Sequence, residues 1–183
     1  MPIIQFFPIR TLDSEHSTGS SELGQLPDWN LNDLYTATDA KELIRDLNWL
    51  EKECNEFAKS YEGKLHTLSD KEMLTCIVRN EKISSISGRI ISYAGLLYYQ
   101  KTTDADRAKF LSDMQEKITV FTTKLVFFSL EINSLEDEFL DKLFTKNDQL
   151  ARYKPVFEKI RAMKPYQLND EIEKFLHDLG ICL

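Results

Sequence analysis

The chain has 183 residues and a formal net charge of −7 at pH 7. A chain of this length buries about 70% of the surface that it exposes when unfolded, which is enough for one domain with a hydrophobic core. Acidic and basic residues are mixed along the sequence, and no basic stripe could displace counterions from phosphates. We therefore expect no nucleic-acid partner.

The N-terminus lacks the pattern of a secretory signal peptide, because Pro2, Gln5 and Pro8 interrupt its apolar residues and no cationic region precedes them. No stretch approaches the roughly 20 apolar residues of a membrane helix. An odd number of cysteines without close pairs fits a reducing compartment. We expect a soluble cytoplasmic protein without a membrane partner, in which Cys54 and Cys76 are buried free thiols.

The first 35 residues contain two different segments. Residues 1–26 are rich in Ser, Thr and Gly without helical or strand period, which predicts a flexible tail. Its Phe6–Phe7 pair could dock on the domain or on a partner. Leu26–Tyr35 mixes turn formers with Trp29 and other large apolar side chains, which must pack on something. We interpret it as a strap across the helices; a lip that contacts peptides is the alternative.

The first helix is expected to start near Thr38 or Asp39, which are both good N-caps, and to end at Gly63. Its apolar residues alternate at steps of four and three, which places them on one side of a helix. They are Leu43, Leu47, Leu50, Cys54, Phe57 and Tyr61.

The second helix is predicted to begin at a capping box formed by Ser69 and Glu72 and to continue to about Tyr99. It contains Gly88 and Gly95, each of which costs about 1 kcal/mol relative to Ala in a helix. We expect close packing of a neighbouring helix to offset that cost.

The clearest helical pattern follows, between Thr103 and Ile132. Its apolar residues recur at steps of three and four, the narrow seam of coiled-coil-like packing. They are Leu111, Met114, Ile118, Phe121, Leu125, Phe128 and Ile132. A helix of about 30 residues would be roughly 45 Å long. It needs partners of similar length, and the two preceding helices provide them.

Three shorter helices complete the prediction. Ser134 is expected to cap the fourth, Pro155 to lie in the first turn of the fifth, and Asn169 or Asp170 to cap the last, which ends at Gly180. No strand pattern competes. The predicted fold class is therefore all-α: a bundle of about six helices, three of them long, over residues 27–183.

The sequence contains no recognisable catalytic motif. His16, His66 and His177 form neither HExxH nor an i, i+4 pair, and neither CxxC nor a Gly-rich phosphate loop is present. Nothing favours a Ser/His/Asp or Cys/His site assembled from distant residues. We therefore predict no catalytic, cofactor-binding or metal-binding residue in this chain.

Two groups of polar residues have an alternative interpretation. One acidic group could be a metal patch: Glu131, Glu136, Asp137, Glu138 and Asp141. Acids are also favoured on solvated helix faces and at helix N-termini, which is our interpretation of this group and of Asp104, Asp106, Glu171 and Glu173. Four tyrosines could bind a peptide backbone, although packing is the interpretation we favour. They are Tyr93, Tyr98, Tyr99 and Tyr166.

Several of these stretches, in this order, resemble one known family. They are Leu26-Pro27-Asp28-Trp29-Asn30-Leu31-Asn32-Asp33-Leu34-Tyr35, then Phe57-x-x-x-Tyr61-x-Gly63-Lys64-Leu65, then Ile91-Ser92-Tyr93-Ala94 before Asp104, then Lys164-Pro165-Tyr166-Gln167-Leu168 with Glu171 and Glu173. The order resembles the N-terminal region of the oligoendopeptidase F branch of the M3 zinc metallopeptidases. The resemblance runs from about Leu26 to Leu179. Its more specific parts are the Trp29 segment and Tyr166-Gln167-Leu168.

The resemblance implies a wall of a substrate channel without its catalytic machinery. Members of the family continue into a larger helical part, where HExxH and a downstream glutamate bind zinc and activate water. Neither motif is present, so no zinc ligand or general base can be assigned to this sequence. The largely apolar end Ile181–Leu183 resembles a cut edge, and we expect a truncated or split gene, or a fragment.

We therefore expect the N-terminal, channel-forming domain of an oligopeptide-hydrolysing metallopeptidase, inactive alone and without a cofactor of its own. Its partner would be the missing catalytic domain, or a separate chain that carries it, and oligopeptides would bind only in the complete enzyme. A standalone helical interaction module or a homodimer is the alternative. An autonomous enzyme is not expected, because a hydrolytic zinc site needs about three protein ligands.

Overall fold

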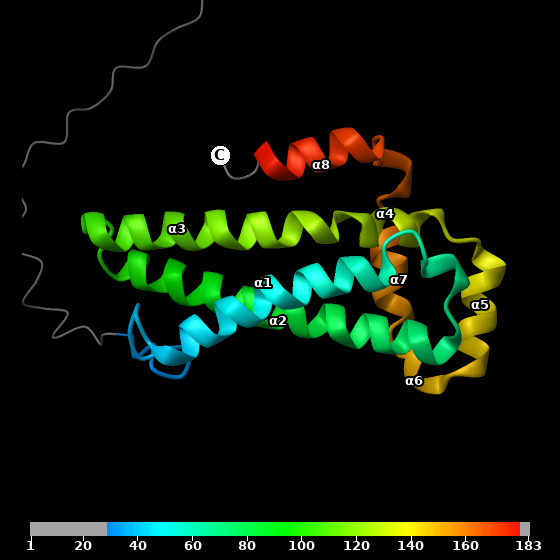
Figure 1. Ribbon diagram of the computed structural model, residues 1–183, viewed down its shortest axis with the longest axis horizontal. Helices are drawn as coiled ribbons and strands as arrows, with labels where there is room; N and C mark the ends of the chain where they lie inside the picture. The colour runs from blue at the N-terminus through cyan, green and yellow to red at the C-terminus, as the bar shows by residue number, and fades with distance from the viewer. Residues whose placement is uncertain (1–28, 180–183) are drawn as a thin grey trace, which may run out of the picture.

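The computed structural model describes residues 29–179, except for the side chains of Asp170, Lys174 and Asp178. Within this range the regular elements are all helical, which confirms the all-α prediction (Figure 1). The predicted tail of residues 1–26 and the predicted stop at Gly180 lie outside the described residues. In chain order the elements are α1 (Lys41–Tyr61), η1 (Leu65–Thr67), α2 (Asp70–Gln100), α3 (Ala105–Thr122), η2 (Thr123–Leu125), α4 (Val126–Ser134), α5 (Asp137–Lys146), α6 (Asp148–Ala151), α7 (Lys154–Arg161), η3 (Lys164–Tyr166) and α8 (Asp170–Leu179).

The long helices run side by side (Figure 1). α2 is antiparallel to both α1 and α3, and α4 continues the direction of α3 along one edge of the bundle. At the end of α4 the chain turns into α5, and α6 and α7 lead it back towards α4. α8 then lies on the outer side of α3, η2 and α4. Several short helices and the last helix therefore surround α4.

The two predicted apolar seams form the core. In α1 the seam residues Leu43, Leu50, Cys54 and Phe57 are almost completely buried. Along α3 and α4, four seam residues are buried and the other three are partly buried against them. Full burial of one large apolar side chain is worth about 1.5–3 kcal/mol, so these seams provide most of the driving force for bundle formation.

The predicted continuous helix from Thr103 to Ile132 is interrupted at η2. Threonine hydroxyl groups account for the break. The Oγ1 atoms of Thr122 and Thr123 donate to the carbonyl oxygens of Ile118, at 2.9 Å, and Thr119, at 2.8 Å. Such bonds compete with the helical ladder, and β-branched residues favour helix less than straight-chain ones. The seam nevertheless stays on one side, because α4 resumes the direction of α3.

The predicted helix ends are partly correct. The Ser69–Glu72 capping box is present, Gly63 has a φ of +75°, Pro155 lies in the first turn of α7, and Asn169 Oδ1 accepts from the backbone N–H of Ile172 at 2.9 Å. These signals are local in sequence, which is why they could be recognised without a fold.

Two predicted caps are wrong. α1 begins at Lys41 after Ala40, which provides no side-chain cap, so neither Thr38 nor Asp39 caps it. Ser134 is the last residue of α4, and its hydroxyl donates to the carbonyl of Glu131 at 2.8 Å. Because this hydroxyl is bound within α4, Ser134 does not cap the next helix. The residue before α5 is Glu136, whose side chain provides no cap.

The expected close packing at the two glycines of α2 is not found. A Cβ atom added at Gly88 would have no neighbouring atom within 4 Å, and one added at Gly95 would meet only a ring carbon of Tyr99, at 3.7 Å. Neither glycine is required by a neighbouring helix in the described part of the chain.

The segment before α1 is a strap, as predicted, from Leu31 to Tyr35. Its Leu31 and Leu34 pack against the core, and Tyr35 is 3% exposed. The Tyr35 hydroxyl donates to Asp46 Oδ2 at 2.9 Å and accepts from Arg89 Nε at 3.1 Å, while Arg89 also forms an ion pair with Asp46. Burial and the Asp46 carboxylate raise the pKa of Tyr35 to about 12.

Trp29 differs from the rest of the strap, because it is 55% exposed. Its backbone carbonyl accepts a hydrogen bond from the Gln100 side-chain amide at 2.7 Å.

No single helix within residues 29–179 is both long and apolar enough to span a membrane. One pair of helical segments reaches the length and apolar composition of a membrane span only when its two members are taken together. They are Ala105–Ser134 and Asp137–Lys146, and the chain bends by 97° between them.

Candidate functional site

The residues considered as metal ligands do not converge. No group of three or more His, Cys, Asp or Glu within the described residues could hold a metal ion. His66 lies in η1, whereas Nδ1 of His177 lies 3.0 Å from the hydroxyl oxygen of Thr123 and links α8 to η2. His16 lies outside the described residues.

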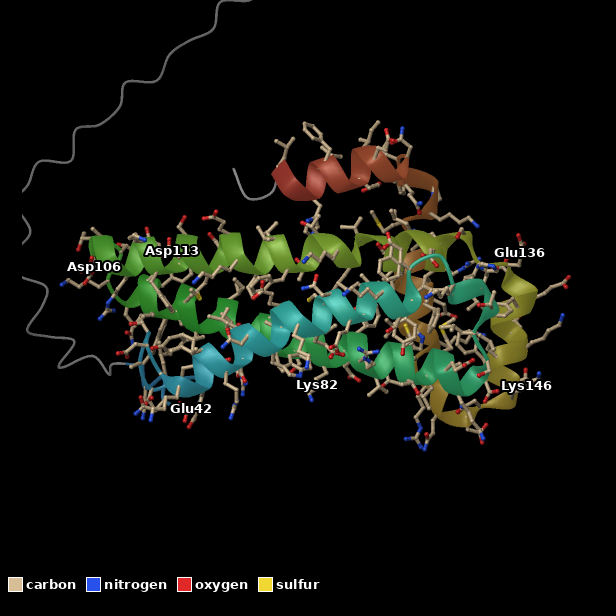
Figure 2. The ribbon with its side chains drawn as sticks, in the orientation of Figure 1. Glu42, Lys82, Asp106, Asp113, Glu136 and Lys146 are labelled. Atoms are coloured by element: carbon tan, nitrogen blue, oxygen red, sulfur yellow. The ribbon has the colours of Figure 1, made fainter. Side chains whose placement is uncertain are left out.

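The acidic group around α5 is mainly a solvated helix start, as interpreted from the sequence. Asp137 and Glu138 lie in the first turn of α5, and both are exposed. Figure 2 shows Glu136 pointing outward at the end of the bundle. Asp137 also forms an ion pair with Arg161, whose Nη1 donates to the carbonyl oxygens of Ile132 at 2.9 Å and Leu135 at 2.7 Å. Arg161 thereby satisfies carbonyls at the end of α4, where the helix dipole favours a cation.

Glu131 does not belong to that solvated face, and here the sequence interpretation is wrong. Its carboxylate is half-buried and accepts from the backbone N–H groups of Gly63, at 2.5 Å, and Leu65, at 3.2 Å. These bonds connect α4 to the loop between α1 and α2. The arrangement is structural, since both carboxylate oxygens bind backbone groups of the same loop.

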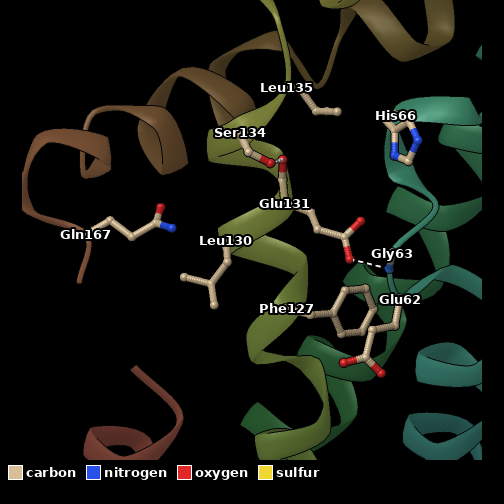
Figure 3. A pocket seen from close by; sticks show the side chains of 9 residues that line it. All are labelled: Glu62, Gly63, His66, Phe127, Leu130, Glu131, Ser134, Leu135 and Gln167. Atoms are coloured by element: carbon tan, nitrogen blue, oxygen red, sulfur yellow. Dashed lines mark hydrogen bonds between the residues drawn. The ribbon is translucent and has the colours of Figure 1, made fainter. Parts of the chain in front are cut away.

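Beside this contact lies a first cavity of about 420 Å³, shown in Figure 3. Gly63 and His66 lie on one side of α4 and Gln167 on the other, while Glu131 points from α4 towards Gly63. The residues that line the cavity are Glu62, Gly63, His66, Phe127, Leu130, Glu131, Ser134, Leu135 and Gln167.

A second cavity of about 510 Å³ lies among α4, α7, η3 and the start of α8, and it shares Leu130 and Gln167 with the first. Its lining combines apolar side chains with one cation, one anion and three uncharged polar groups. The residues are Ser129, Leu130, Asn133, Lys159, Ile160, Met163, Tyr166, Gln167 and Glu173.

Asn133 is the unusual member of this second cavity. The residue is 5% exposed, and its Nδ2 donates to Gln167 Oε1 at 2.7 Å. Its Oδ1 is buried and has no hydrogen-bond partner within the described residues. A buried acceptor left unsatisfied costs about 1–3 kcal/mol, so it indicates either a role in binding or an ordered water.

The four tyrosines considered as peptide contacts do not form one site. Tyr93 is buried, with its ring 5.4 Å from that of Tyr35 and 6.1 Å from that of Phe110, which confirms packing for this residue. Tyr98 and Tyr99 are neighbours at the end of α2, with ring centroids 5.5 Å apart. Tyr166, in η3, is 76% exposed and lines the second cavity.

Cys54 and Cys76 are buried free thiols, as predicted. Burial raises the pKa of Cys54 to about 11 and that of Cys76 to about 12. Thiols held in their neutral form are poor nucleophiles, so neither is a candidate catalytic group.

Sequence reasoning did not identify Asn133 or Lys159 as site residues. An exposed lysine carries no signal in a helix pattern. Gln167 belonged to a stretch noted only for resemblance. Their convergence depends on the docking of α7 and η3 against α4, which sequence spacing does not specify.

Two comparisons with known proteins give a match, one by sequence and one by fold. The model of the N-terminal domain of M3 peptidases, described as oligopeptidase F, matches residues 131–183. The crystal structure of oligoendopeptidase-F from Enterococcus faecium has a similar fold, with a TM-score of 0.71 and 20% sequence identity over 79% of this chain and 27% of that chain. The comparison with curated proteins gives no match.

These two findings confirm the predicted resemblance to the N-terminal region of that enzyme type. This chain spans 27% of the length of the solved enzyme. The stretch that matches the family model begins at Glu131, and it contains most of the residues that line the second cavity.

Proposed function

We propose that this chain is the N-terminal, substrate-channel-forming domain of an oligoendopeptidase F-like metallopeptidase, and that it hydrolyses no peptide alone. The match over residues 131–183 and the similar fold of the Enterococcus faecium enzyme support this proposal. The catalytic zinc would be held by the rest of the enzyme, because the described part of this chain has no cluster of metal ligands.

The observation that carries the proposal is an exposed apolar surface near the C-terminal end of the described chain. α8 is amphipathic, yet four of its large apolar residues are at least 38% exposed: Ile172, Phe175, Leu176 and Leu179. Three large apolar residues before α8 are exposed as well: Met163, Tyr166 and Leu168. We call these seven residues the C-terminal apolar surface.

An amphipathic helix normally buries its apolar side, and a large exposed apolar patch marks an interaction site. We assign this surface to contact with the catalytic part of the enzyme. That part is either a continuation of the same chain or a separate chain. In the assembled enzyme, the bundle forms one wall of a channel for oligopeptides, in the cytoplasm and without a nucleic-acid or membrane partner.

Reconstitution tests the proposal. The DNA downstream of the Leu183 codon, read in all three frames, should encode a helical sequence with HExxH. That product, combined with this chain, should cleave a fluorescence-quenched oligopeptide and lose activity on addition of a chelator, whereas this chain alone should not cleave it.

The surface assignment has its own variant and control. Phe175→Ser, in the C-terminal apolar surface, should reduce co-purification with the catalytic part. Val78→Ser, at an exposed valine of α2, should leave it unchanged. Equal loss with both variants, or no loss with either, would contradict the assignment.

The same exposed surface also favours a second candidate, a standalone interaction module that forms a homodimer. Light scattering separates the two functions. A defined dimer that persists at low protein concentration would favour the module, whereas a monomer, or ill-defined aggregates at high concentration, would favour the oligopeptidase domain.

A further inference from the structure

We propose that the cavity among α4, α7, η3 and α8 binds the carboxyl end of a short peptide with an apolar terminal side chain. The choice of a peptide as the ligand rests on the proposed function. The site itself rests on three features of the cavity: an amide pair whose acceptor has no partner among the described residues, apolar walls, and a lysine that forms no ion pair with the described side chains.

The amide pair consists of Asn133 and Gln167. Asn133 Nδ2 donates to Gln167 Oε1 at 2.7 Å, which leaves the Asn133 Oδ1 acceptor and the Gln167 NH₂ donors for other partners. A peptide group presents one N–H donor and one C=O acceptor. The pair therefore matches a peptide group, provided that a small movement of the half-buried Gln167 side chain opens access to Asn133 Oδ1.

The walls are suited to an apolar side chain. Leu130 is buried, Ile160 is partly buried, and Met163 and Tyr166 are exposed at 61% and 76%. A flexible methionine and a tyrosine ring that are this exposed can move to cover a bound group without disrupting the core. Each apolar Å² that such a ligand removes from water contributes about 25 cal/mol.

The charges around the cavity select the end of the peptide. Lys159 is exposed and forms no ion pair with any side chain that the structure describes, although the chain carries a net charge of −7. Glu173 lies on the same cavity, but its Oε1 already accepts from the backbone N–H of Leu168 at 2.8 Å. Lys159 is thus the cation on this cavity, and it favours a carboxylate.

The cavity lies next to the surface that we assign to contact with the catalytic part. Its lining includes Met163 and Tyr166, which belong to the C-terminal apolar surface. A peptide held here would lie at the edge of the contact with the catalytic part. The bundle would then hold the carboxyl end of a substrate, and would not serve as a passive wall.

The experiment is an NMR titration of the uniformly ¹⁵N-labelled full chain with acetyl-Leu-Phe, which has a free carboxyl group. Binding should shift the side-chain NH₂ signals of Asn133 and Gln167 together with the backbone signals of Met163 and Tyr166. Acetyl-Leu-Phe amide, which lacks the negative charge, should bind about fivefold more weakly, the value of a solvent-exposed ion pair.

Variants at exposed positions keep the test independent of folding. Lys159→Gln should weaken binding of the free acid by about fivefold and leave binding of the amide unchanged. Tyr166→Ala should weaken both peptides. The controls are Lys59→Gln, at an exposed lysine of α1, and Tyr99→Ala, at an exposed tyrosine of α2, and both should bind as the parent chain does.

Three results would overturn the site: no shift of the Asn133 and Gln167 side-chain signals up to about 10 mM peptide, equal effects of Lys159→Gln and Lys59→Gln, or equal affinity for the acid and the amide. Because the titration uses this chain alone, its result is independent of reconstitution. Peptide binding without reconstituted activity would refute the oligopeptidase proposal and keep the site. Reconstituted activity without peptide binding would refute the site and keep the oligopeptidase proposal.

Discussion

At the scale of single residues, backbone conformation separates glycines that the fold needs from those that it does not. Gly63 has a φ of +75°, a conformation that L-residues with a side chain adopt only at a cost, and it follows α1 where the chain must reverse. Gly88 lies within α2 in ordinary helical conformation with open space around it.

This contrast gives a prediction with an internal control. Gly88→Ala should raise the free energy of unfolding by about 1 kcal/mol, because alanine favours the helix and meets no neighbour. Gly63→Ala should lower it by about 1–2 kcal/mol, because the added Cβ atom is strained at positive φ. Urea denaturation of both variants measures whether the free energy of unfolding rises or falls in each. A loss of stability in Gly88→Ala would contradict the open surroundings of that residue.

At the scale of secondary-structure elements, polar contacts over long sequence separations hold the ends of helices in place. Glu131 joins α4 to the loop between α1 and α2, and Arg161 joins α7 to the last carbonyls of α4. Glu131 from the first contact and Leu135 from the second both line the first cavity. The helices supply the apolar core, whereas these bonds determine where the loops beside the cavities lie.

Glu131→Ala tests this view of the loop. The variant should lose about 1.5–3 kcal/mol of unfolding free energy, the usual value of hydrogen bonds to a charged group. The amide protons of Gly63 and Leu65 should exchange faster with solvent, since they lose their acceptor. Hydrogen exchange followed by NMR measures this directly.

Glu138→Ala is the matched control, because Glu138 is exposed in the first turn of α5 and should change stability by less than about 0.5 kcal/mol. If exchange at Gly63 and Leu65 were equally slow in Glu131→Ala and the parent chain, the carboxylate would not be what orders the loop.

At the scale of the whole molecule, the bundle is well packed on one side and open on another. Its core extends through the seams of α1, α2, α3 and α4, yet the C-terminal apolar surface is left uncovered in the described chain. The chain also spans 27% of the length of the solved enzyme with the similar fold. Such a combination is expected of a domain that packs against a larger partner.

Self-association of the isolated chain should therefore depend on this surface. Static light scattering should show an apparent mass that rises with protein concentration, and the double variant Phe175→Ser with Leu176→Ser should reduce the rise. The Val78→Ser variant should behave as the parent chain does, because Val78 lies outside the surface. A concentration-dependent mass that both variants leave unchanged would locate the association elsewhere on the bundle.

The sequence predicted much of the fold and little of the candidate site. Steps of three and four between apolar residues identified the seams of α1 and of α3 with α4, and the Ser69–Glu72 pair identified the start of α2. The break at η2 was missed, although Thr119, Thr122 and Thr123 were a local signal for it. Gly88 was assigned to close packing because its small size was known and its surroundings were not.

By itself, the sequence determined the all-α class, the faces of the long helices and several of their ends, because each depends on residues within a few turns of one another. Only the tertiary structure decided that Glu131 binds the loop at Gly63 and Leu65, and that Asn133 meets Gln167 beside Lys159. Those contacts join residues 34 to 68 positions apart. They follow from how α4, α7, η3 and α8 dock, and periodicity along one helix does not specify docking between helices.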